Sequence, residues 1–129
     1  MEILLLGAVI MVFALLASAW LMTFARWFPI KGIDGEFLTD YKTLIRAHID
    51  FALMALFCLA FYATKIPLPI TACWLVVIGG IANPCVFVVA AFDPDFWEKT
   101  IWKVYTVISF IITTIGFAWV GITLLTYAL

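Results

Sequence analysis

The most constraining feature of this sequence is a succession of four apolar stretches, each about as long as a helix that crosses a lipid bilayer. They cover residues 3–25, 44–62, 68–91 and 104–128. A helix needs about 20 consecutive apolar residues to span the hydrocarbon core. None of the stretches shows the alternation of polar and apolar residues that a membrane barrel strand requires. The sequence therefore predicts an all-α integral membrane protein.

The composition indicates that lipid is the solvent for most of the surface. Of the 129 residues, 67% are hydrophobic and 12% are charged, whereas about a quarter of the residues in a soluble domain are charged. The net charge of −1 provides no basic surface for nucleic acid. The first stretch lacks the basic start of a secretory signal, so we expect a retained helix. We predict one membrane domain, 1–129, folded as an antiparallel four-helix bundle.

The basic residues favour one orientation in the membrane. The connections 26–43 and 92–103 and the helix ends beside them hold six of the seven, and the opposite side holds only Lys65; the six are Arg26, Lys31, Lys42, Arg46, Lys99 and Lys103. Basic residues concentrate in cytoplasmic loops. We therefore expect both connections in the cytoplasm and both termini on the other side of the membrane.

Two groups of residues are expected to serve packing or solvation rather than chemistry. The three cysteines lie in apolar stretches and form no CxxC pair; they are Cys58, Cys73 and Cys85. Thiols in such positions are more often small packing residues than ligands. Asp93-Pro94-Asp95 predicts the end of one helix and the start of a short interfacial turn. The carboxylates around it are expected to form a solvated acidic loop.

Polar side chains inside the predicted spans are few, and each needs a reason because a polar group in hydrocarbon is costly. The main ones are Arg46, His48, Asp50 and Asn83. Arg46 lies close enough to the membrane surface for its guanidinium to reach water, so its simplest role is that of an anchor.

His48 is the most informative of these residues. On a helix it lies about 200° from Asp50 and shares a stripe with Phe51, Ala52 and Ala55. Small residues one turn beyond a histidine leave room for a flat ligand or for a neighbouring helix. A neutral imidazole is a common ligand of metals and haem. The alternative is an interfacial histidine that is hydrogen-bonded to a loop carbonyl.

The absence of a second histidine limits the kind of metal site that one chain can build. It excludes a haem held by two histidines of the same chain, and it leaves a zinc site without enough ligands. A five-coordinate haem with one open position fits a lone histidine best. Met54 or Met11 could close the sixth position, although methionine in a membrane span usually fills space.

Asn83-Pro84 marks a second unusual point. Proline removes one helix hydrogen bond and frees a carbonyl near residue 80. Gly79 and Gly80 come just before it, so we expect a bend and a close approach to a neighbouring helix. The Asn83 amide can either satisfy the freed backbone or contact a ligand, and both interpretations stay open.

These segments together resemble the bacterial styrene oxide isomerases. Arg46-Ala47-His48 followed by Ala52-Leu53 is similar to the haem-ligand segment of that family. Ala82-Asn83 is similar to an Ala-Asn pair in its third helix. Nine residues after that asparagine the family has Phe-x-Pro, and Phe92-Asp93-Pro94 stands here. The resemblance covers the chain from about residue 7 to the end of the fourth stretch.

The resemblance implies a homotrimer in the bacterial inner membrane, with a haem b between adjacent protomers and His48 as its axial ligand. It also implies that Asn83 contacts the pocket and that Arg46, Ala52 and Ala55 lie beside the haem. In that family the ferric iron acts as a Lewis acid on an epoxide oxygen and opens the ring to a carbonyl product without net redox. The implied activity is therefore isomerisation of a small hydrophobic epoxide.

Two departures from the family pattern bear on the reaction. Met54 stands where the family has an asparagine, and Phe87 stands where it has a tyrosine. Those two polar groups orient substrate in the family, and losing such a group costs orders of magnitude in rate or selectivity. Two alternatives therefore stay open: a non-catalytic haem protein for electron transfer, sensing or an accessory role, and a haem-free structural subunit.

Overall fold

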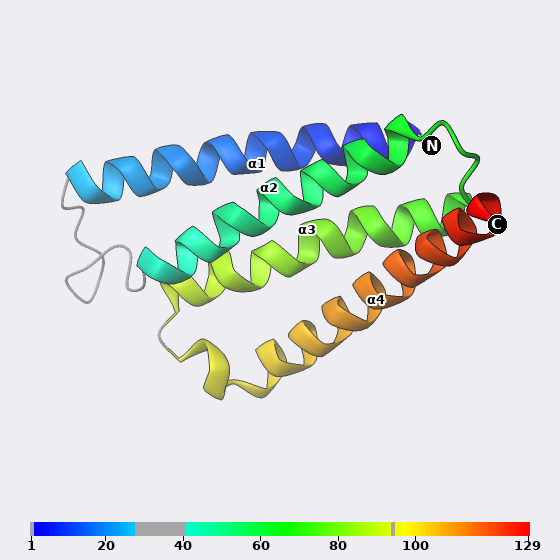
Figure 1. The fold of residues 1–129 in the computed structure, drawn as a ribbon. Coiled ribbons are helices and arrows are strands. Elements are labelled where there is room, and N and C mark those ends of the chain that lie inside the picture. Colours follow the sequence, from blue (N-terminus) through cyan, green and yellow to red (C-terminus); the bar gives the residue numbers. More distant parts are fainter. Residues whose placement is uncertain (1, 28–40, 94) are drawn as a thin grey trace.

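A computed structural model of the chain describes residues 2–27, 41–93 and 95–129 (Figure 1). These residues form four long helices and a short 3-10 helix: α1 (Glu2–Trp27), α2 (Tyr41–Ala63), α3 (Ile70–Phe92), η1 (Phe96–Glu98) and α4 (Thr100–Ala128). Each long helix is long and apolar enough to cross a membrane. The prediction of an all-α membrane protein with four transmembrane helices is confirmed.

The helix starts differ from the predicted ones by a few residues, for identifiable reasons. Helices α2 and α4 begin at Tyr41 and Thr100, three and four residues before the predicted 44 and 104. Their first turns contain polar residues, which continue the helix beyond its apolar part. Helix α3 begins at Ile70, two residues after the predicted 68. Leu68 precedes Pro69, and a residue before proline avoids the helical conformation.

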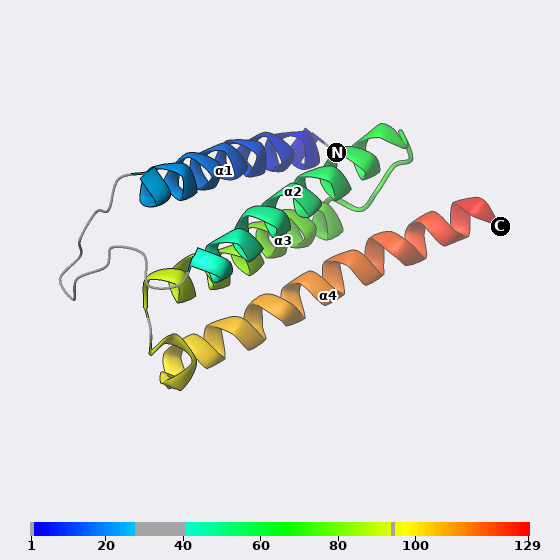
Figure 2. The ribbon, with the colours of Figure 1, turned by 60° about the vertical axis from the view of Figure 1, so that its left-hand side comes forward.

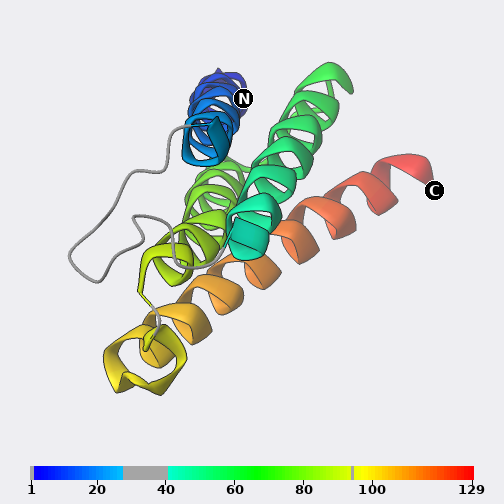
Figure 3. The same cartoon turned by 90° about the vertical axis from the view of Figure 1, so that its left-hand side faces the viewer.

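Helix α3 is the centre of the bundle. It packs against α1, α2 and α4, whereas α4 packs its backbone only on α3 and η1 among the described elements. Figure 3 shows α1 and α4 on opposite sides of α3. Half of the α3 span is buried inside the protein, compared with 17% of the α4 span. Most of the surface of α4 is thus not covered by the other described elements.

The chain alternates in direction from one long helix to the next. The start of α1, the end of α4 and the short link 64–69 lie at one end of the bundle, and the end of α1, the start of α2 and η1 lie at the other (Figures 1 and 2). The predicted loop 26–43 falls mainly on 28–40, which lies outside the described residues. The helix ends that flank the two basic connections lie at the same end of the bundle. The placement of both connections in the cytoplasm remains a prediction.

Glycines bring α3 and α4 into backbone contact. A Cβ atom added at Gly79 would lie 2.8 Å from the Cα of Thr113, and one added at Gly116 would lie 2.8 Å from the backbone nitrogen of Val76. Side chains at these positions would therefore hold the helices apart. The expected close approach beside Pro84 is confirmed, and α3 continues as an α-helix through that proline.

The main core lies where α1, α2 and α3 meet. Its largest members come from all three helices and include Leu4, Met11, Phe51, Cys58, Cys73 and Val76. All three cysteines are free, and Cys58 and Cys73 are buried in this core. The expectation of packing thiols is confirmed. Met11 is fully buried.

The connection between α3 and α4 contains the predicted short turn. Helix η1 follows Asp95, whose backbone N–H donates to the Asp93 carboxylate at 3.0 Å. Phe96 is buried and stacks on Trp102 with ring centroids 5.4 Å apart. Phe96 and Trp102 thus pack the start of α4 against the end of α3.

Candidate functional site

The imidazole of His48 faces helix α1 from within the membrane span of α2. That span begins at Lys42, six residues earlier (48 − 42), which is about 9 Å at the rise of an α-helix. His48 Nδ1 lies 2.9 Å from the Oγ of Ser18 and 3.1 Å from the carbonyl oxygen of Leu15. The side chain is half-buried. The carbonyl that it meets belongs to a helix rather than to a loop.

The contacts of Nδ1 favour a proton on that atom. The Leu15 carbonyl can only accept a hydrogen bond, so an unprotonated Nδ1 beside it would place two lone pairs together. The Ser18 hydroxyl donates to the same carbonyl at 2.8 Å, which leaves its oxygen lone pairs free to accept. With Nδ1 as the donor, neutral His48 carries its lone pair on Nε2. No described residue forms a hydrogen bond with Nε2.

The residues that share the His48 stripe divide into two groups. Phe51 and Ala55 are buried in the core between the helices, with 5% and 3% of their surface exposed. Ala52 is half-buried. Ala55 thus serves helix packing within the chain, whereas Ala52 keeps surface that a bound group could reach.

Arg46 is exposed and forms no ion pair with a described residue. It lies two residues before His48, which places it on a different face of α2. This position agrees with an anchor at the membrane surface.

Asn83 lies on a different interface from His48. Its side chain is buried, and its Oδ1 accepts a hydrogen bond from the Ser109 hydroxyl of α4. Next to it, the Tyr105 hydroxyl donates to the carbonyl of Ala82 at 3.0 Å. Within one chain, therefore, His48 faces α1 while Asn83 faces α4. The roles of Ser109 and Tyr105 went unrecognised because sequence spacing does not show which helices meet.

Met54 and Phe87, the two departures from the family pattern, both lie between α2 and α3. Met54 is half-buried, and its Cβ is 3.5 Å from where a Cβ on Gly80 would stand. Phe87 packs against a small cluster that includes Ala47. Both apolar side chains fill space in the helix interface.

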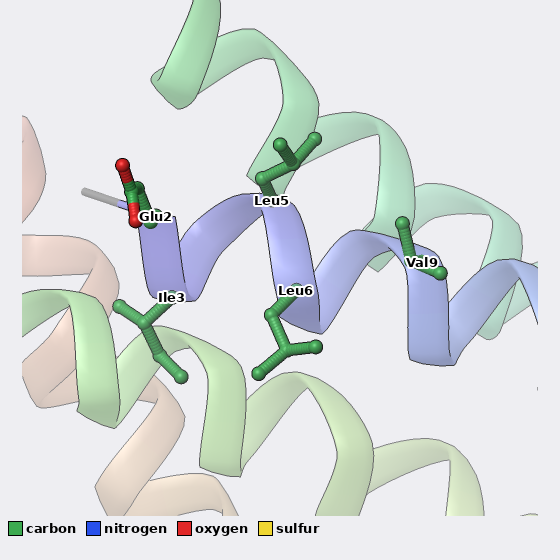
Figure 4. A pocket seen from close by; sticks show the side chains of 5 residues that line it. All are labelled: Glu2, Ile3, Leu5, Leu6 and Val9. Atoms are coloured by element: carbon green, nitrogen blue, oxygen red, sulfur yellow. The ribbon is translucent and has the colours of Figure 1, made fainter.

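The described residues provide no site made of several metal ligands. They contain no group of three or more histidine, cysteine, aspartate or glutamate side chains that could hold an ion. A hollow on the outer side of α1 (Figure 4) is lined by residues of that helix alone: Glu2, Ile3, Leu5, Leu6 and Val9. It lies well before Leu15 and Ser18, so it is separate from His48.

Comparisons with protein-family models, curated proteins and solved structures found no match for this chain. A functional assignment therefore depends on the residues and their geometry. Among the polar groups in the spans, His48 combines a fixed ring with a metal-ligating nitrogen that has no partner in the described structure.

Proposed function

We propose that this protein is a membrane-embedded haem b protein in which Nε2 of His48 is the axial ligand. The observation that carries the proposal is the arrangement at Nδ1, which the Leu15 carbonyl and Ser18 hydroxyl hold. Histidines that bind metals commonly donate their other ring N–H to a carbonyl or a similar acceptor, which fixes the tautomer and the ring orientation.

The surroundings of His48 fit a haem better than a bare metal ion. A haem supplies four of its own nitrogen ligands, so one protein nitrogen is sufficient. Its large apolar surface also suits a lipid-facing position, and the exposed surface near His48 includes Ile49 and Leu53. One chain provides one ligand and the walls of two helices. The proposal therefore includes a homo-oligomer, a trimer by resemblance, in which a neighbouring copy completes the site.

The proposal extends to chemistry on a small hydrophobic substrate. When bound, the haem supplies a Lewis acid that polarises the oxygen of an epoxide, which favours opening to an aldehyde or ketone. The residues of the chain would hold the haem through His48 and exclude water with apolar side chains. Asn83 reaches such a site only if a second copy brings its α3–α4 face to His48.

A non-catalytic haem protein is the second candidate, and a specific observation favours it. Met54 and Phe87 are apolar and packed between α2 and α3. Neither can donate a hydrogen bond to a substrate oxygen. If the haem is loaded and no aryl epoxide is converted to an aldehyde, the protein serves electron transfer, sensing or an accessory role instead.

The absorption spectrum of the purified protein tests the proposal. We expect a Soret band in the wild type, its loss in His48→Ala, and haem affinity lower by about 10- to 100-fold in Ser18→Ala. Thr23→Ala is the matched control, because the Thr23 hydroxyl bonds only to the Ala19 carbonyl of its own helix at 2.9 Å. A wild-type spectrum in His48→Ala would remove the proposal and favour a haem-free structural subunit.

A further inference from the structure

We draw no further inference here: the strongest candidate, the two buried thiols that Cys58 of α2 and Cys73 of α3 place in the core where α1, α2 and α3 meet, carries nothing because the described structure shows no bond between the two sulfur atoms and both side chains serve the packing of that core.

Discussion

The helix pairs α1–α2 and α3–α4 are each joined by a serine hydroxyl inside the membrane, but the two polar contacts differ in how far the surrounding helices enclose them. Ser18 meets His48 across the first pair, and Ser109 meets Asn83 across the second. Asn83 is only 8% exposed, whereas His48 is half-buried. The second contact is enclosed by its helices, and the first leaves one side of its ring accessible.

The two helix pairs also differ in their use of glycine. Helices α3 and α4 place Gly79 and Gly116 directly against each other's residues. Helix α2 has no glycine, and Gly7 of α1 faces Val77 of α3 rather than α2. Small residues allow membrane helices to pack by close backbone contact. The α3–α4 pair therefore uses glycine for its backbone contact, whereas α1 and α2 pack without a glycine between them.

The strongest test of this comparison is a methyl group at the α3–α4 contact. We expect Gly116→Ala to destabilise the protein by about 1–3 kcal/mol, as overpacking typically does, because the atoms it would meet belong to the backbone of Val76 and Leu75. Reversible unfolding in mixed micelles measures the change.

Gly121→Ala is the matched control on the same helix. Nothing lies within 4 Å of a Cβ at Gly121, so this variant should lose no stability and can gain helix propensity. Equal effects of the two substitutions would show that close glycine packing does not hold α3 to α4.

A double-mutant cycle on Ser109→Ala and Asn83→Ala isolates the enclosed polar contact. We expect a coupling of about 0.6 kcal/mol and not above about 1.7 kcal/mol, the range found for hydrogen bonds between membrane helices. The free energy of unfolding of the two single variants and the double variant provides the value. A coupling of zero would mean that the contact between Ser109 and Asn83 does not help to hold α3 to α4.

The existence of the four helices followed from the sequence, but their pairing did not. Apolar run length predicts a membrane helix because the bilayer sets its length. The same runs say little about which face is inside, since lipid and protein core are both apolar. Nothing in the sequence showed that α3 is central or that α4 lies at the edge with 17% of its span buried.

The candidate site was predictable only in part for a related reason. His48, Asp50 and Asn83 are conspicuous because polar groups are rare in the spans. Their partners are not, because Ser18 is 30 residues from His48 and Ser109 is 26 from Asn83. Serine in a membrane helix often bonds to its own backbone, so only the fold shows which serines cross to another helix.

The smallest effect is expected outside the membrane, at the connection between α3 and α4. Lys99 lies 2.7 Å from the Asp93 carboxylate. Its hydrogen bond holds the pKa of Asp93 below the ordinary 3.8, and Asp93 raises the pKa of Lys99 above 10.5. The contribution of the Asp93 carboxylate to the stability of the fold is therefore present above pH 3.8. It is lost as the pH falls through the lowered pKa of Asp93. The contribution of Lys99 to the stability of the fold is present below pH 10.5 and is lost as the pH rises through the raised pKa of Lys99.

Because the ion pair is exposed, salt should weaken it and its loss should hardly change stability. We expect the carboxyl NMR titration of Asp93 to have a higher midpoint in Lys99→Gln than in the wild type. The stability of Lys99→Gln should remain close to that of the wild type, since glycine contacts inside the membrane hold α3 to α4. An unfolding free energy as low as that of Gly116→Ala would instead make the connection, and not the glycines, the main constraint on this helix pair.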